Sequence, residues 1–293
     1  MKVIKVEDVK KSYNKTLILK DINFSVSAGC ICGFIGPNGA GKTTTMNIIA
    51  GYLKADSGEA TVLNQTVSFK QPPTGIRFIE DVPEFYNYLT IDEYLNFIKD
   101  LNKLESKDVV AILDLIGLKN AKEKRISTLS RGMRQRLAIG AAILPKPEVL
   151  LCDEPFSALD PVGRKEIFDI FKKLKGEITI LFSTHILEDV EKICDQIVLI
   201  NEGKIILDDS LNNILKDTLG EYLEVVFKKR ADKDLFLKDF KPLSFKSNTV
   251  KLEKTEMLKV IKWCAKHKIE PIGITKVRGT LESVFLKEVG FNE

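Results

Sequence analysis

Eight consecutive residues have the types and spacing of a phosphate-binding loop. Their order, Gly-Pro-Asn-Gly-Ala-Gly-Lys-Thr, matches the P-loop motif GxxxxGK[ST]. Glycines let backbone N–H groups close around phosphate oxygens, and the start of the following helix adds free donors and a partial positive charge. Lys42 is expected to reach the β- and γ-phosphates, and the Thr43 hydroxyl is expected to hold Mg²⁺. The predicted phosphate-binding residues are Gly36, Pro37, Asn38, Gly39, Ala40, Gly41, Lys42, Thr43 and Thr44.

Two adjacent carboxylates form a second candidate site. Asp153 and Glu154 directly follow the apolar run Val149–Cys152. A buried strand that delivers an aspartate beside a nucleotide is the Walker B arrangement. Asp153 is expected to hold Mg²⁺, directly or through water, because magnesium keeps several waters and needs few carboxylates. Glu154 would then face the γ-phosphate and act as the general base that polarises the attacking water.

The elements around these motifs alternate between strand and helix. An apolar run at 31–35 leads into the P-loop, and a helix-like segment at 44–50 follows it. Further strands are predicted at 149–152, 179–183 and 197–200, with helices between them. Alternating βα units of this kind predict a mostly parallel sheet.

Two other segments have different patterns. Residues 1–30 alternate and contain turn residues, which predicts short antiparallel strands. Residues from about 82 to 146 read as helices and interrupt the βα series, so they are predicted to form an inserted subdomain. Thr90 and Glu93 have the spacing of a capping box at the start of the first inserted helix.

The pattern changes again near residue 209. Residues 210–293 predict a small accessory α+β domain with no chemical motif. Its predicted strands are 222–228, 248–253 and 269–277, and its predicted helices are 231–240, 256–267 and 280–289. Its large aromatic residues are interpreted as core; they are Phe236, Phe240, Trp263 and Phe285.

The predicted fold class is therefore α/β. Residues 1–209 form a P-loop NTPase core with a mostly parallel sheet, an N-terminal antiparallel β-subdomain and the inserted helical subdomain. The α+β domain over 210–293 completes the chain.

The composition of the chain indicates which broad class of protein it belongs to. The chain has 293 residues, of which 44% are hydrophobic and 29% charged, as expected for a soluble protein with a packed core. A net charge of +4 is too small to argue for nucleic acid as a partner. No apolar stretch approaches the roughly 18 residues of a membrane-spanning helix, and the start does not resemble a signal peptide. The five cysteines lack metal-site spacing and are expected to be reduced core residues.

With these motifs in place, residues 3–209 resemble the ATP-binding cassette (ABC) ATPases. The Walker motifs are accompanied, in family order, by four further matches. Leu129–Met133 matches the signature, usually LSGGQ, and Ser157–Asp160 matches the D-loop. Tyr13 matches the aromatic residue that stacks on adenine, and His185 matches the switch histidine.

The resemblance implies ATP and Mg²⁺ as cofactors, and an ATPase. Family members dimerise head to tail, as homodimers or heterodimers, and the signature of one subunit closes the ATP site of the other. Ser130, Arg131, Gly132 and Asp160 would then contact the partner subunit's site, with Ser130 and the Gly132 amide donating to the γ-phosphate. His185 would contact that γ-phosphate and sense its loss.

The resemblance also implies a partner and a location. ABC ATPase subunits of this kind lie on the cytoplasmic face of the cell membrane and power an integral membrane permease. The segment Thr280–Leu286 resembles a tail motif of exporters whose permease is a separate chain. The transported substrate is contacted by the permease, so this sequence does not identify it.

Two residues depart from the family pattern. The signature has Arg131 and Met133 where the family usually has glycine and glutamine. The Q-loop position falls on Glu80 or Asp81, with Asp81 favoured by alignment through Pro83. An acid there can still hold magnesium or water, so Asp81 is predicted as a metal ligand.

In the family, a groove between the core and the helical insert receives a short helix of the permease. The Q-loop neighbourhood and the first inserted helix should line this groove. Phe85, Tyr86 and Tyr88 form an aromatic cluster there. Such a cluster is either local core or an exposed anchor for a partner.

Other classes of P-loop protein fit less well. A GTPase needs an Asn-Lys-x-Asp motif, which is absent from the sequence, and a kinase has no use for a signature or D-loop. A DNA-repair ABC ATPase carries a long coiled coil between its Walker motifs, and a translation factor usually carries two cassettes. The remaining alternative is a non-transport ABC ATPase that regulates or remodels a partner complex.

Overall fold

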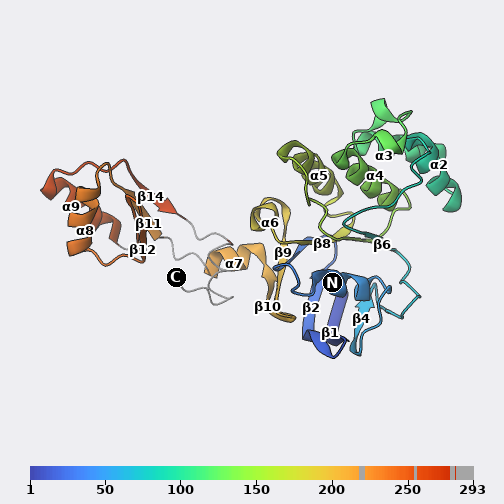
Figure 1. Cartoon of the computed structure of the whole chain (residues 1–293), viewed down its shortest axis with the longest axis horizontal. Helices are drawn as coiled ribbons and strands as arrows, with labels where there is room; N and C mark the ends of the chain where they lie inside the picture. The colour runs from blue at the N-terminus through green and yellow to red at the C-terminus, as the bar shows by residue number, and fades with distance from the viewer. Residues whose placement is uncertain (218–221, 254–255, 278–280, 282–293) are drawn as a thin grey trace. The chain divides into compact units, whose positions relative to one another are not determined.

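The computed structural model describes residues 1–217, 222–253, 256–277 and 281. The chain forms two compact units, Met1–Leu211 and Asn212–Glu293 (Figure 1). Within the described ranges, no helix is both long and apolar enough to cross a membrane. The five cysteines are free, four of them buried and Cys30 partly buried.

The first unit begins with a four-stranded antiparallel sheet in the order β2-β1-β4-β5. Its strands are β1 (Lys2–Tyr13), β2 (Thr16–Ser27), β4 (Ser57–Val62) and β5 (Gln65–Thr66). The antiparallel pairing predicted over residues 1–30 is confirmed, but the predicted short strands are wrong, because β1 and β2 are each 12 residues long. Asp8 and Asp21, which look like turn residues, have positive φ and lie at register shifts inside the strands. They bend the ribbon as bulges instead of ending it.

The central sheet has six strands in the order β10-β9-β3-β8-β7-β6. The strands are β3 (Ile31–Ile35), β6 (Ile76–Ile79), β7 (Val149–Cys152), β8 (Thr179–Thr184), β9 (Gln196–Asn201) and β10 (Lys204–Ser210). All but β10 run parallel, which confirms the predicted mostly parallel α/β sheet. Every residue of β3, β7 and β8 is buried, as their continuous apolar runs require. The carboxyl ends of these three strands meet at one edge, where ligands bind in such sheets.

Helices surround this sheet. Three of them follow its strands: α1 (Lys42–Ile49), α5 (Pro161–Leu174) and α6 (Leu187–Ile193). The helical block contains α2 (Ile91–Leu101), α3 (Ser106–Leu115) and α4 (Arg131–Ile143), with 3₁₀ turns at Lys119–Ala121 and Ile126–Thr128 (Figure 1). The capping box that starts α2 is confirmed, since the backbone N–H of Thr90 donates to Glu93 Oε2 at 2.8 Å and that of Glu93 to Thr90 Oγ1 at 3.1 Å.

The second unit contains a β-α-β-β-α-β sequence of elements. After α7 (Leu211–Asp217), these are β11 (Tyr222–Val226), α8 (Arg230–Asp239), β12 (Ser244–Lys246), β13 (Thr249–Glu253), α9 (Met257–His267) and β14 (Gly273–Val277). The antiparallel strand order β12-β13-β11-β14 is that of the ferredoxin-like arrangement. β14 starts later than the predicted residue 269, because Pro271 has no N–H to pair.

The helices of this unit cover one face of its sheet with aromatic residues. Phe236, Phe240 and Trp263 are buried there, as predicted. The Trp263 indole N–H donates to Asp239 Oδ2 at 2.7 Å, and its ring stacks on His267 with centroids 4.3 Å apart. Phe285 and the helix predicted at 280–289 lie outside the described residues, except for Leu281.

Candidate functional site

The loop after β3 has the backbone shape of a phosphate cradle. Gly39 and Gly41 have φ angles of 81° and 110°, a region that disfavours residues with a side chain. Gly41 is also the N-cap of α1, so the free N–H groups of this helix start at the loop. A Cβ at Gly36 would clash with the carbonyl oxygen of Ile200. The loop therefore presents bare backbone donors to a ligand.

Lys42 bends back over this loop. Its side chain is only 6% exposed, and its Nζ donates to the carbonyl oxygens of Gly36 at 2.8 Å and Pro37 at 3.2 Å. The same Nζ lies 3.3 Å from Glu154 Oε1. A buried ammonium group beside the loop can form strong charge-assisted hydrogen bonds with phosphate oxygens.

A buried hydroxyl connects the Asp153 carboxylate with the backbone of Glu154 after β7. Asp153 is 5% exposed, and its Oδ1 accepts a hydrogen bond from Ser183 Oγ at 2.5 Å. Ser183 Oγ in turn accepts from the backbone N–H of Glu154 at 2.8 Å. The sequence analysis missed Ser183 as a site residue. The signal that indicates it is a hydroxyl in the otherwise apolar run of β8, two residues before His185.

Glu154 connects three parts of the site. Its backbone has a positive φ of 45°, an uncommon conformation for a residue with a side chain and one that recurs at functional sites. Its carboxylate contacts Lys42 through Oε1, and its Oε2 lies 3.1 Å from His185 Nδ1. Glu154 is thus in direct contact with both Lys42 and His185.

A cavity of about 340 Å³ connects Lys42 and Glu154 with Tyr13, the residue predicted to stack on adenine. It is lined by Tyr13, Ile18, Asn38, Gly39, Gly41, Lys42, Thr43, Thr44 and Glu154. The Tyr13 ring is 45% exposed and lies 5.6 Å from Lys11 Nζ. One cavity therefore contains an aromatic face at one part and the phosphate loop at another, which suits a nucleotide.

The metal donors predicted from the sequence are Thr43, Asp81 and Asp153. Burial raises the pKa of the Asp81 carboxyl, the Arg131 charge opposes this, and the charges of Asp153 and Glu154 raise it further. The negative charges of Asp153 and Glu154 therefore act on the Asp81 carboxyl. Its Oδ1 is buried without a hydrogen-bond partner among the described residues.

These donors suit magnesium better than a metal that needs a complete protein cage. In the described part of the chain, no group of three or more His, Cys, Asp or Glu residues could hold a metal ion. Mg²⁺ is usually held by one or two carboxylates together with phosphate oxygens and waters. The residues present fit such an ion.

The signature and D-loop residues lie away from this cavity. Ser130 Oγ caps α4 by accepting from the N–H of Met133 at 3.3 Å, and Asp160 Oδ1 caps α5 by accepting from Gly163 at 2.8 Å. Ser130, Arg131, Gly132 and Asp160 are not among the residues that line the P-loop cavity. Within one chain, none of these four residues lines the cavity, although Arg131 contacts Asp81.

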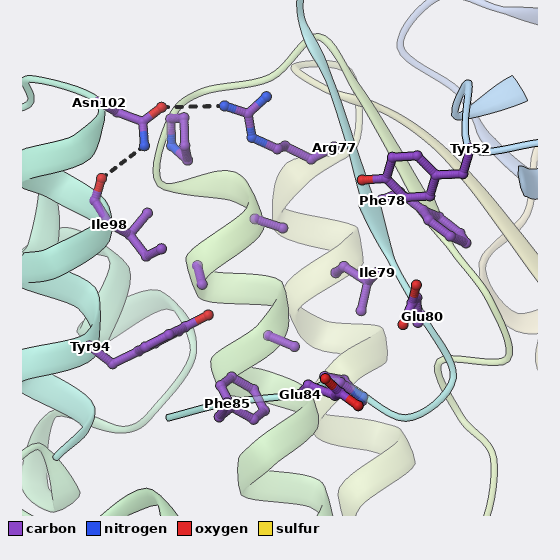
Figure 2. A pocket seen from close by; sticks show the side chains of 15 residues that line it. Tyr52, Arg77, Phe78, Ile79, Glu80, Glu84, Phe85, Tyr94, Ile98 and Asn102 are labelled. Atoms are coloured by element: carbon purple, nitrogen blue, oxygen red, sulfur yellow. Dashed lines mark hydrogen bonds between the residues drawn. The ribbon is translucent and has the colours of Figure 1, made fainter. Parts of the chain in front are cut away.

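A second cavity, of about 370 Å³, lies between the core and the helical insert (Figure 2). We call it the insert groove. Phe85 lines it and packs edge-to-face on Tyr94, with ring centroids 5.3 Å apart. Tyr86 and Tyr88 are 52% and 71% exposed and lie outside its lining. The predicted aromatic cluster is thus divided between a half-buried lining residue and two exposed ones.

Comparisons with known proteins agree with this geometry. The ABC transporter family model matches residues 19–157. The chain is 39% identical to the ABC transporter ATP-binding protein YxlF of Bacillus subtilis over 69% of each chain. It is 36% identical to the bacitracin transport ATP-binding protein BcrA of Bacillus licheniformis, over 76% of this chain and 74% of BcrA. A solved ATP-binding cassette of an ABC transporter, in its ADP conformation, superposes with a TM-score of 0.66 and 25% identity over 75% of this chain and 95% of that one. The chain therefore belongs to the ABC transporter family, as an ATP-binding subunit that hydrolyses ATP.

Proposed function

We propose that this subunit powers a separate integral membrane permease from the cytoplasmic face, and that two ATPase subunits pair to complete each ATP site. The observation that carries this proposal is the division of the site. Lys42 and Glu154 line the P-loop cavity, whereas Ser130 and Gly132 lie outside it. A head-to-tail pair would supply a second chain's signature to the open side of the cavity. The pair is formed by two copies of this chain or by this chain and a related subunit.

The residues of the cavity have separate roles in hydrolysis. Lys42 and the loop amides bind the phosphates, and Thr43, Asp153 and Asp81 would hold Mg²⁺, which neutralises charge on the β- and γ-phosphates. Ser183 holds Asp153 through one oxygen. Glu154 accepts the proton of the attacking water as general base. His185, in contact with Glu154, keeps the carboxylate oriented.

The insert groove is the proposed docking site for the permease. Its lining combines aromatic residues with two exposed acids, Glu80 and Glu84, and with Arg77, which donates to Asn102 (Figure 2). Aromatic side chains in a concave site are suitable anchors for an apolar helix face. The acids favour a partner segment that also carries lysine or arginine.

We infer export as the direction of transport. The inference is supported by the resemblance of Thr280–Leu286 to an exporter tail, a segment that lies outside the described residues except for Leu281. It also agrees with the acidic Q-loop residue Asp81. BcrA, a relative, is named for bacitracin transport. The substrate of this chain's own permease is not specified by these observations.

One experiment separates this proposal from the alternative of a non-transport ABC ATPase. The tagged full chain is purified from detergent-solubilised membranes of its native cells, and its partners are identified by mass spectrometry. A polytopic membrane protein that co-purifies and raises the ATPase rate in proteoliposomes is the expected result. Recovery of soluble partners alone, with no ATPase response to membrane proteins, would favour a regulatory or remodelling ATPase.

A further inference from the structure

Two departures from the family pattern contact one another in this chain. The Q-loop position carries Asp81 and the first variable signature position carries Arg131, where the family usually has glutamine and glycine. Asp81 Oδ1 and an Arg131 Nη lie 3.7 Å apart. Opposite charges thus stand at both positions and form an ion pair.

The pair joins two elements that act on different ATP sites. Asp81 is two residues beyond the end of β6, whose last residue, Ile79, accepts a hydrogen bond from the backbone N–H of Asp153. Arg131 is the first residue of α4, directly after the signature serine Ser130. The ion pair therefore connects a proposed Mg²⁺ ligand of this chain's own ATP site with the signature, which would contact the ATP site of the partner subunit.

Helix stability does not explain Arg131. The first turn of a helix carries a partial positive charge, so a cation there is unfavourable. The first turn of α4 contains no acid of its own that would offset this charge. Asp81 supplies the opposing charge from another element. This arrangement indicates a role for Arg131 that depends on Asp81.

The Asp81 carboxylate is only partly compensated by this pair. Oδ1 is fully buried and has no hydrogen-bond partner among the described residues, although the side chain as a whole is 44% exposed. Asp153 and Glu154 face Asp81 with like charge, and Arg131 faces it with opposite charge. Mg²⁺ and the Arg131 guanidinium would therefore compete for the negative charge of this one carboxylate.

We propose that Arg131 is a positioning residue that competes with Mg²⁺ for Asp81. While Asp81 is paired with Arg131, the Q-loop is held to the signature end of α4 in the same chain. When Asp81 binds Mg²⁺ instead, the ion pair breaks and the Q-loop is no longer held to α4. This inference rests on the proposed Mg²⁺–ATP site and adds a link between metal binding and the freedom of the signature helix.

The test is a Mg²⁺ titration of nucleotide binding to the full chain. The free Mg²⁺ concentration for half-maximal binding of a fluorescent ATP analogue is measured for wild type, Arg131→Ala, Asp81→Asn and the double variant. An exposed ion pair is worth about 0.2–1 kcal/mol, so Arg131→Ala is expected to lower this midpoint roughly 1.5- to 5-fold. Asp81→Asn should raise it. Arg131→Ala should have no further effect in the Asp81→Asn background.

Controls separate the possible outcomes. Arg131→Lys keeps the charge and should hold the midpoint near that of wild type, and Arg125→Ala removes an exposed arginine elsewhere in the insert. If Arg131→Ala shifts the midpoint equally in both backgrounds, Arg131 acts by general charge and the proposal is wrong. An unchanged midpoint in Arg131→Ala also overturns it. Failure of wild type to bind the analogue at any Mg²⁺ concentration would instead contradict the proposed ATP site.

Discussion

Lys42 Nζ lies 3.3 Å from Glu154 Oε1, with 6% and 16% of their side chains exposed. The group expected to bind the γ-phosphate thus neutralises the group expected to activate water. Phosphate oxygens compete for the same ammonium, so nucleotide binding should free the Glu154 carboxylate. This contact connects ATP binding to the readiness of the base.

The first prediction concerns the base. Glu154→Gln keeps the shape of the side chain but removes its proton affinity, so ATP binding should persist while turnover falls by about 10²–10⁴-fold. Phosphate release and nucleotide titration on the same preparation measure the two properties. Lys42→Ala is the matched comparison, because it should weaken nucleotide binding itself. Equal ATPase rates in Glu154→Gln and wild type would remove Glu154 from the role of base.

The second prediction concerns the Ser183 hydroxyl, which bridges the Asp153 carboxylate and the backbone N–H of Glu154. Ser183 is fully buried and bonds both Asp153 and the Glu154 N–H. Ser183→Ala leaves these groups unpaired, so the free energy of unfolding should fall by about 1–3 kcal/mol and turnover should decrease. Chemical denaturation and steady-state ATPase assays test this. Ser57→Ala, at an exposed strand position, is the control. A Ser183→Ala protein with wild-type stability and rate would show that the bridge is dispensable.

The third prediction concerns assembly. If the signature completes the partner's site, saturating Mg²⁺–ATP should drive Glu154→Gln from monomer to dimer, as seen by multi-angle light scattering. Gly132→Asp in the same background should block this, because its carboxylate would oppose the γ-phosphate. The monomer should tolerate that change, since a Cβ at Gly132 meets its nearest atom at 3.8 Å. A Glu154→Gln protein that stays monomeric would point to an obligate, different partner subunit.

The fourth prediction concerns the insert groove. Phe85→Ala and Tyr86→Ala should weaken permease capture in a pull-down while leaving ATP affinity nearly unchanged, because aromatic anchors dominate such interfaces. Phe69→Ala removes an aromatic residue that is 46% exposed and lies outside both the groove lining and the aromatic cluster, and it is the matched control.

Phe85 also packs on Tyr94, so its variant requires a thermal-unfolding check. Loss of folding would assign Phe85 to the local core. Glu84→Lys avoids this ambiguity, because Glu84 is exposed, and it should weaken capture of a basic permease segment. Normal capture by Phe85→Ala, Tyr86→Ala and Glu84→Lys, each correctly folded, would exclude the groove as the docking site.

The sequence by itself was enough to identify the motifs whose residues are close together in the chain. A P-loop works through the backbone of adjacent residues, so Gly36–Thr43 could be identified without the fold. The same holds for Asp153 and Glu154 after an apolar strand, and for the Thr90 capping box. In each case the spacing along the chain already fixes the spacing in space.

Tertiary structure decided what depends on residues far apart in the chain. Asp8 and Asp21 are of a residue type that is common in turns, but both lie within long paired strands, as bulges. Ser183 became a site residue only because β7 and β8 are neighbours in the sheet. Asp81 and Arg131, 50 positions apart, appeared as two separate departures from a pattern until packing of the insert placed them 3.7 Å apart. Local propensity cannot encode such contacts, because they arise from which elements the hydrophobic core brings together.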